Sequence, residues 1–268
     1  MKEELIYHKF MELIIGAFNT ILYRPLFNIL VLFYEYLPGK SFGLAIIVLT
    51  ILIKLVFYPL GVKAIKSQKS LSELQPKIKE IQEKYKNDKE QQTKEMMALY
   101  KKEKLNPFSG CLPLLIQLPV LIALYRIFWR GLAEEQMVFL YSFVPRPEII
   151  NTVFLKTIDL SKAVFIEIEG VRHYLWGNII LIILVGLTQF LQTKLAGPKL
   201  KSSKNKNSNF SDQLQKQMQY FMPFFIVLFL LKLPAAIGLY WLITTLFTIL
   251  QQYVILKKKN EPRKLAEN

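Results

Sequence analysis

The sequence predicts an all-α membrane protein: five transmembrane helices around a cytoplasm-open polar groove, with a cytoplasmic helical hairpin and an outer interfacial helix. Three observations support this fold class. Of the 268 residues, 52% are hydrophobic, and they gather into long runs with few charges, as helices that cross a bilayer require. The mean hydropathy is positive, at +0.27. The net charge of +15 is concentrated between these runs.

The apolar runs divide the chain into alternating spans and connections. The expected spans are 42–61, 107–130, 175–195 and two helices within 217–256. The expected connections are the N-terminal segment 1–41, a hairpin over 62–106, an external loop over 131–174, a basic loop over 196–216 and a basic tail over 257–268. The sequence Lys232-Leu233-Pro234 predicts a turn between the last two helices, because proline cannot continue the helical hydrogen-bond ladder.

The charges of the connections predict the orientation. Basic and acidic residues number 12 and 7 in 62–106, 6 and 1 in 194–216, and 5 and 2 in 257–268, against 4 and 6 in 131–175. Cytoplasmic connections carry an excess of lysine and arginine, so the first three segments are expected in the cytoplasm and the last outside. The positive charge is therefore a topology signal, and recognition of a specific nucleic acid sequence is not expected.

The N-terminal segment has two interpretations. Its apolar runs 13–23 and 25–34 are interrupted by Arg24-Pro25, and each is too short to span a bilayer alone. We prefer an interfacial helix over about 24–37 on the outer surface. Residues 11–23 are alternatively an uncleaved, signal-like span, since nothing resembles a cleavage site or a lipidated cysteine.

The segment 62–106 predicts two antiparallel helices. One apolar stripe repeats at steps of three and four residues, and a second follows the Asn87-Asp88 turn. The stripes are Leu71, Leu74, Ile78, Ile81 and Tyr85, and then Met96, Met97 and Tyr100. Pro76 is expected to kink the first helix. The hairpin is either a solvated connector or a mobile docking element for a nascent chain.

Lys54 lies within the first span, where a charge costs roughly 2.5–3.5 kcal/mol on insertion scales. No Asp or Glu occurs within the five expected spans, so an ion pair inside the bilayer is not available. The lysine either snorkels toward the inner surface or faces a hydrated groove, open to the cytoplasm, that receives acidic or polar segments of other proteins.

The sequence gives little support for a catalytic site or a metal-binding site. The chain has one cysteine, Cys111, and two histidines, His8 and His173, far apart in sequence. No phosphate-binding loop, dinucleotide fingerprint or nucleophile triad appears, so the protein is not expected to be an enzyme. The external loop fits a soluble hairpin or an interfacial turn, and Tyr174 and Trp176 stand where an aromatic belt is expected.

Four blocks of sequence resemble the YidC/Oxa/Alb family of membrane protein insertases. The run GLAIIVLTILIKLVFYPL (43–60) is similar to the first core span of that family, and NPFSGCLPLLIQLP (106–119) is similar to its second. The motifs MQYFMP (218–223) and GLYW (238–241) resemble its last two spans. The blocks occur in order on the expected spans, and the resemblance covers most of 24–256.

The resemblance implies an insertase and chaperone of the bacterial plasma membrane, of the short YidC type, that works without ATP, cofactor or covalent chemistry. It implies a client-binding groove with its charge at Lys54 and further contacts at Thr50, Gln117, Tyr240 and Trp241. An apolar guide surface would come from Leu114, Phe221 and Phe224, for which plain helix packing is an equal interpretation. The bacterial family usually carries arginine where this chain has Lys54, which weakens bidentate pairing with a carboxylate.

Newly made membrane proteins and membrane lipids are the expected partners, with the Sec translocon and the ribosome as further candidates. The large periplasmic domain of some relatives has no room here, and the short tail after Leu256 does not favour ribosome attachment through a long tail. Two other functions stay open. One intramembrane cation could shape a small ion channel or transporter, although matching broken helices are not seen, and a purely structural assembly factor would tolerate loss of Lys54.

Overall fold

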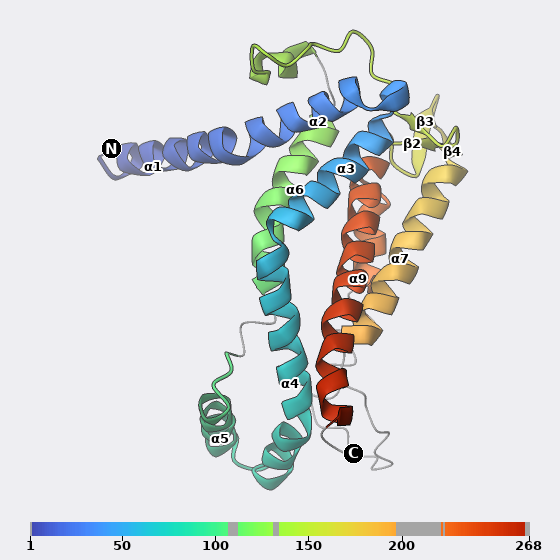
Figure 1. The fold of residues 1–268 in the computed structure, drawn as a ribbon. Helices are drawn as coiled ribbons and strands as arrows, with labels where there is room; N and C mark the ends of the chain where they lie inside the picture. Colours follow the sequence, from blue (N-terminus) through green and yellow to red (C-terminus); the bar gives the residue numbers. More distant parts are fainter. Residues whose placement is uncertain (1, 107–111, 131–133, 197–220, 222, 266–268) are drawn as a thin grey trace. The chain divides into compact units, whose positions relative to one another are not determined.

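The computed structural model describes residues 2–106, 112–130, 134–196, 221 and 223–265 (Figure 1). The chain forms two compact units. The first comprises Met1–Ile53, Ile116–Val185 and Leu228–Ile243, and the second comprises Lys54–Leu115, Gly186–Val227 and Thr244–Asn268. The architecture is mainly helical, as the sequence predicts, and the strands of the described residues form two short hairpins.

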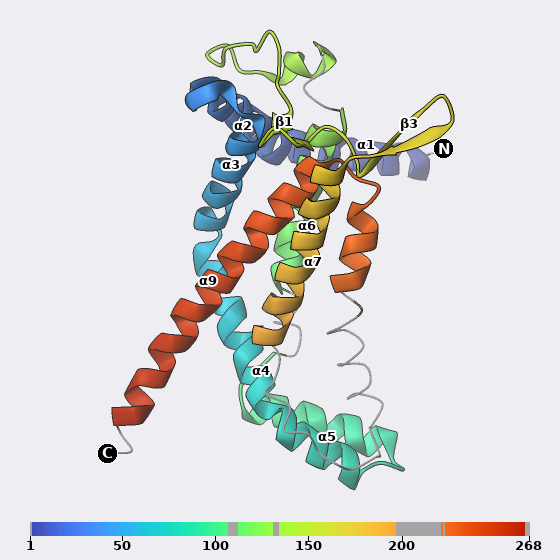
Figure 2. The ribbon, with the colours of Figure 1, turned by 90° about the vertical axis from the view of Figure 1, so that its right-hand side faces the viewer.

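A continuous helical rod opens the first unit. It consists of α1 (Lys2–Phe18), a π-helical turn (Asn19–Tyr23) and α2 (Arg24–Tyr36). The two apolar runs that Arg24-Pro25 separates in the sequence therefore belong to one helical rod. The Arg24 N–H bonds to the Asn19 carbonyl five residues back, and this wider turn accommodates the proline that cannot donate. Figures 1 and 2 show the rod lying across the ends of α3 and α6.

The core of the first unit is formed by α2, α3 (Phe42–Val56) and α6 (Leu112–Arg130). Large apolar and aromatic side chains of these helices are completely or nearly completely buried, among them Phe27, Leu30, Tyr34, Ile46, Leu49, Leu124 and Ile127. A 3-10 helix over Glu134–Phe139 follows α6. This packing fixes α3, the helix that carries Lys54 in its last turn.

Two antiparallel hairpins lie between α6 and α7 (Trp176–Ala196). β1 (Val153–Phe154) pairs with β2 (Ile158–Asp159), and β3 (Phe165–Ile168) pairs with β4 (Val171–Tyr174). Asn178 of α7 is fully buried and donates to the carbonyls of Asp159, Lys162 and Ala163. The start of α7 is thereby fastened to the strands that precede it.

The second unit contains a helical pair within the segment 62–106. α4 (Tyr58–Lys84) continues through Pro76, and Asp88 caps α5 (Lys89–Lys102) by accepting from the Gln91 N–H at 2.9 Å. Leu74 and Ile78 are buried, as the predicted seam requires, and the Gln92 amide donates to the Gln82 carbonyl at 3.0 Å. Met97, expected in the second stripe, is exposed instead.

Three described helices are long and apolar enough to cross a membrane, namely Tyr7–Tyr36, Trp176–Leu195 and Ala235–Leu256 within α9 (Ala235–Leu265). α3 and α4 pass the same test only as a pair bent by 68°. The span expected at 42–61 is therefore not one straight helix, because Pro59 starts a new helix after Phe57. Leu115–Trp129 is shorter, and residues 223–230 are helical before the turn at Leu233-Pro234.

Candidate functional site: a lysine and a polar column on α9

Lys54 occupies the last turn of α3 and reaches a threonine of α9. Its ammonium donates to the Thr248 hydroxyl oxygen at 3.0 Å. The Thr248 hydroxyl in turn donates to the Thr244 carbonyl at 2.8 Å. Because that bond uses the only hydroxyl proton, the oxygen presents its lone pairs to the ammonium. Thr248 is therefore a fixed acceptor that holds the lysine toward α9.

Polar side chains recur on α9 around this contact. Thr244, Thr248 and Gln252 are spaced by four residues, which places them on one face of the helix. The Thr244 hydroxyl oxygen and the Gln252 amide oxygen are buried without a hydrogen-bond partner among the described residues. We call these three residues the polar column. Buried polar atoms in membrane segments are normally satisfied by protein, water or a ligand.

Gln251 lies beside the polar column and fastens α9 to the start of α4. Its amide donates to the Tyr58 carbonyl at 3.1 Å. A Cβ built on Gly61 would stand 2.8 Å from that amide nitrogen, so a larger residue would push the side chain away. The hydrogen bond between Gln251 and Tyr58 thus keeps the polar column close to the start of α4.

No carboxylate neutralises Lys54 in the part of the chain that the structure describes. Ion pairs there are made by other basic residues, among them Lys40, Lys69 and Lys77. A neutral hydroxyl alone compensates a desolvated ammonium poorly. The arrangement therefore leaves a cation with capacity for an anionic or strongly polar partner.

In the first unit, Gln117 of α6 and Tyr240 of α9 are in contact, and the Gln117 amide donates to the Tyr240 hydroxyl. Tyr240 is 1% exposed and Gln117 is half-buried. Thr50 is also 1% exposed, and its hydroxyl donates to the Ile46 carbonyl of its own helix. Trp241 is half-buried. The contact between Gln117 and Tyr240 joins two residues that were selected from the sequence separately.

Two of the three residues selected for the guide surface, Phe221 and Phe224, have exposed aromatic side chains. Phe221 is 52% exposed and Phe224 is 58% exposed, and the ring of Phe221 stacks on Phe225 at 6.0 Å. Leu114 lies in α6, but its side chain is outside the described residues. Exposed phenylalanine in an apolar helix faces lipid or another apolar segment, and the guide-surface assignment stays a prediction.

The sequence analysis did not select Thr248, Thr244, Gln251 or Gln252. A signal was present in the sequence. Thr244, Thr248 and Gln252 recur every four positions in an otherwise apolar run, and Gln251 follows Thr248 by three. That spacing places them on one helix face. What the sequence did not supply was the partner, since Lys54 and Thr248 are separated by 194 residues.

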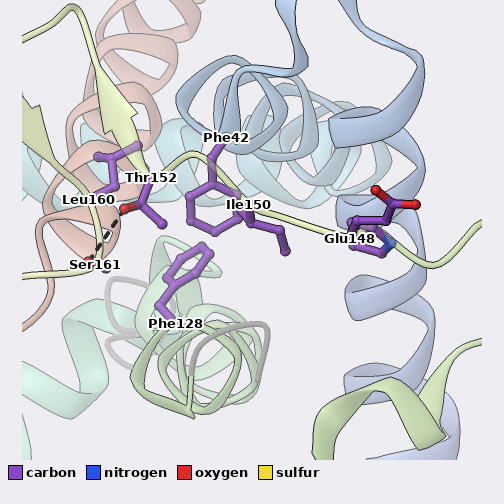
Figure 3. A pocket seen from close by; sticks show the side chains of 8 residues that line it. Phe42, Phe128, Glu148, Ile150, Thr152, Leu160 and Ser161 are labelled. Atoms are coloured by element: carbon purple, nitrogen blue, oxygen red, sulfur yellow. Dashed lines mark hydrogen bonds between the residues drawn. The ribbon is translucent and has the colours of Figure 1, made fainter. Parts of the chain in front are cut away.

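The structure also contains a small cavity of about 260 Å³ in the first unit (Figure 3). Phe42 and Phe128 meet there edge to face at 6.1 Å, and Thr152 donates to Ser161 at the opposite wall. Glu148 is the one ionisable residue of its lining. Among the described residues, no three His, Cys, Asp or Glu side chains could hold a metal ion. The lining contains no arrangement that suggests catalysis.

Apolar helices of spanning length that carry buried polar side chains define a multi-pass helical membrane protein. The family model described as "60Kd inner membrane protein" matches residues 32–263. The chain therefore belongs to this bacterial membrane protein family, and the resemblance stated from its sequence blocks is confirmed.

Curated relatives named "Membrane protein insertase YidC" are similar to most of this chain. That of Syntrophobacter fumaroxidans is 35% identical over 235 residues, which cover 87% of this chain and 37% of the relative. Those of Lawsonia intracellularis and Wolinella succinogenes are 35% and 30% identical and cover 91% and 98% of this chain, and 40% and 42% of the relatives. The chain thus spans about two fifths of the length of these relatives.

Proposed function

We propose that this chain is a membrane protein insertase and chaperone that guides client transmembrane segments and short polar tails into the bilayer. Its relatives are named membrane protein insertases, and this supports the proposed function. The observation that carries the proposal is the ammonium of Lys54, held at 3.0 Å by Thr248 beside the polar column and without a carboxylate among the described residues. One positive charge in a polar, membrane-spanning environment suits the transient binding of an acidic segment.

The proposed topology has five transmembrane helices and a cytoplasmic C-terminus. The basic segments 62–106, 194–216 and 257–268 would then lie in the cytoplasm, and the helical pair α4–α5 would extend from the membrane on that side. Lys54 lies two residues before the end of α3, which leads into this cytoplasmic segment. A groove that opens to the cytoplasm could therefore be hydrated through the end that contains the lysine.

The proposed mechanism lowers the barrier for the polar part of a client. A carboxylate about 4 Å from the ammonium gains about 4 kcal/mol at an effective dielectric near 20, before desolvation is subtracted. An inside-negative potential favours outward movement of that negative charge by a further ~2.3 kcal/mol per 100 mV. Burial of the apolar client segment in lipid supplies the remaining drive. ATP is not needed for these steps.

Client contact in this proposal extends from Lys54 to Thr50, Gln117, Tyr240 and Trp241. Thr50 precedes Lys54 by one helical turn, and Tyr240 and Trp241 precede the polar column on α9. Thr50 and Tyr240 are nearly fully buried, so a client would reach them only after the helices part. Leu114, Phe221 and Phe224 would offer the apolar surface along which the client segment leaves, since Phe221 and Phe224 are already exposed.

Charge reversal at position 54 tests the proposal. The purified protein is reconstituted into liposomes with a single-span client that carries an acidic tail, and insertion is measured by protease protection. We expect Lys54→Glu to lower insertion about tenfold or more, because repulsion of only ~1.4 kcal/mol already changes an equilibrium tenfold. Lys54→Arg should insert the client at nearly the wild-type level, because the positive charge remains.

The matched control is the same client with asparagine in place of its tail aspartates, which Lys54→Glu should insert almost normally. If the Lys54→Glu variant inserted the acidic-tailed client at the wild-type level, the mechanism would be refuted. Failure of every variant on both clients, with the wild type equally inactive, would refute the insertase function itself. Ion flux through the same liposomes in the absence of a client would favour the channel alternative.

A further inference from the structure

The β3–β4 hairpin has a sharply defined geometry. Phe165 pairs with Tyr174 and Ile168 pairs with Val171, and the two turn residues, Glu169 and Gly170, both have positive φ (52° and 77°). Positive φ at both central residues is typical of a type I′ hairpin turn. A two-stranded hairpin is marginally stable in water by itself. It therefore needs another surface to stabilise it.

The two faces of this hairpin differ in chemistry. Directly paired residues and alternate residues of a strand share a face, so Ile166, Ile168 and Val171 lie together with His173. We call this the aliphatic face. Ile168 is 49% exposed and Val171 is 59% exposed.

The opposite face carries the oppositely charged cross-strand neighbours Glu167 and Arg172. The Arg172 guanidinium lies 5.1 Å from the centre of the Phe165 ring on the same face. The same face also carries Tyr174, which is 56% exposed. The aliphatic face is exposed at Ile168 and Val171 near the turn, and Ile166 is half-buried.

The base of the hairpin is fixed to the start of α7. The Leu175 N–H donates to the Val164 carbonyl at 2.9 Å, and the buried Asn178 amide binds the carbonyls just before β3. A Cβ on Gly177 would stand 2.0 Å from the Thr157 carbonyl oxygen, so the turn between β1 and β2 packs directly against this helix. The hairpin cannot move far from the first turn of α7.

The first turn of α7 marks a bilayer surface. Trp176–Leu195 is long and apolar enough to cross the membrane, and its exposed face begins with Trp176 (73% exposed) and continues with Ile180 and Ile183. Tryptophan is enriched at the membrane–water interface. Each strand extends only about 13 Å at 3.3 Å per residue, so the whole hairpin lies within reach of the headgroups. Figure 2 shows it projecting outward from the start of α7, at about the level of α1.

We propose that the β3–β4 hairpin is an interfacial membrane anchor whose aliphatic face inserts into the headgroup–acyl boundary of the adjacent leaflet. The lipid surface is the occupant because it is continuous with the exposed apolar face of α7. Glu167, Glu169 and Arg172 give the hairpin little positive charge, so apolar burial rather than attraction to anionic lipid stabilises the contact. This inference rests on α7 spanning the membrane and is independent of insertase activity.

Neighbouring residues on opposite faces supply the test. In a Cys111→Ser background, Ile168→Cys and Glu167→Cys are each labelled with an environment-sensitive fluorophore in vesicles of neutral phosphatidylcholine. Nitroxide-labelled phosphatidylcholine is then added as a quencher. We expect quenching about threefold stronger at 168 than at 167, because interfacial elements bury their apolar face about 5–10 Å deep. Val171→Cys should behave like Ile168→Cys.

Addition of anionic phosphatidylglycerol should leave this difference unchanged. Equal, water-like emission at both positions would overturn the proposal, and so would quenching at 168 that appears only with anionic lipid. If a client protein protected position 168 and lipid did not quench it, the aliphatic face would be a protein-binding surface. That result would also overturn the proposal. Far-ultraviolet circular dichroism verifies that each labelled variant is folded.

Discussion

Two buried polar sites, Asn28 in the first unit and the polar column in the second, differ in how completely their hydrogen bonds are made. The Asn178 amide oxygen of the first unit is also buried without a partner among the described residues. In the first unit, the Asn28 amide donates to the carbonyls of Arg24 and Phe139 at 2.7 and 2.9 Å, and its oxygen accepts from the Tyr141 N–H at 2.7 Å. In the second unit, the polar column binds Lys54 through Thr248 but leaves the Thr244 hydroxyl oxygen and the Gln252 amide oxygen without a partner among the described residues. The bonds of Asn28 to Phe139 and Tyr141 fasten the segment that follows α6 to α2, and the bond to Arg24 lies within α2.

The comparison separates a structural role from a binding role. A buried polar group whose bonds are all made within the chain stabilises the fold and has little capacity left for a ligand. A buried group with unmade bonds costs stability unless water or a client supplies them. Removal of Asn28 should therefore affect stability, whereas changes in the polar column should affect how the protein treats charged clients.

The largest expected effect on stability is that of Asn28→Leu. The substitution leaves the Tyr141 N–H without its partner, and one orphaned group costs about 1–3 kcal/mol. The Phe139 carbonyl keeps a second donor, the Arg24 Nε–H at 3.1 Å. Denaturant unfolding in detergent micelles should register a loss of that order. Asn151→Ala is the control, because the Asn151 side chain is exposed and accepts only from the nearby Val153 N–H. Equal stability of the two variants would contradict the structural role of Asn28.

Thr248→Val should have an intermediate effect, confined to acidic clients. Valine keeps the shape but removes the acceptor that holds Lys54, so the ammonium is free to snorkel toward the headgroups. We expect insertion of an acidic-tailed client to fall about threefold to tenfold, which corresponds to the roughly 1 kcal/mol of a typical hydrogen bond. A neutral-tailed client should insert normally, and Thr248→Ser should restore the wild-type rate. Equal loss for both clients would assign Thr248 to packing alone.

The sequence predicted much of the fold and part of the site. Hydropathy and local spacing are properties of the sequence itself, and they identified the apolar helices, the turn at Asn87-Asp88 and the turn before α9. Lys54 was selected because a charge in an apolar run is costly wherever it lies. Its partner Thr248 was not predicted, since α3 and α9 meet only through tertiary packing. The continuous helix across Arg24-Pro25 was missed for a related reason, because packing of Tyr23 and Phe27 stabilises a π-helical turn that local rules disfavour.

The smallest expected effect is a loss of stability of the α4–α5 pair at low pH. The Lys77 ammonium donates to Glu103 at 2.6 Å and lowers the pKa of that exposed carboxyl. A carboxyl whose pKa is lowered by folding stabilises the folded state above its unfolded pKa of about 4.3, and this contribution disappears as the pH falls through the lowered value. The protection of amides in α4 and α5 against hydrogen exchange, relative to the intrinsic rate at each pH, should therefore fall slightly below about pH 4. In Glu103→Gln, this loss of protection should be reduced.

Glu73→Gln is the control for this pH dependence, because Lys69 and Glu73 approach only to 3.9 Å on the surface of α4. Exposed pairs of this kind contribute little. An unchanged pH response in Glu103→Gln would mean that the Lys77–Glu103 contact does not stabilise the helical pair.

The access of water to position 54 tests the central claim most directly. In a Cys111→Ser background, Lys54→Cys and Leu52→Cys differ by about 3 Å in depth along α3 but lie on different faces. A charged, membrane-impermeant thiol reagent requires a hydrated thiolate. The account predicts rapid modification at 54 from the cytoplasmic side and almost none at 52. A thiol at 54 as unreactive as that at 52 would contradict the hydrated groove.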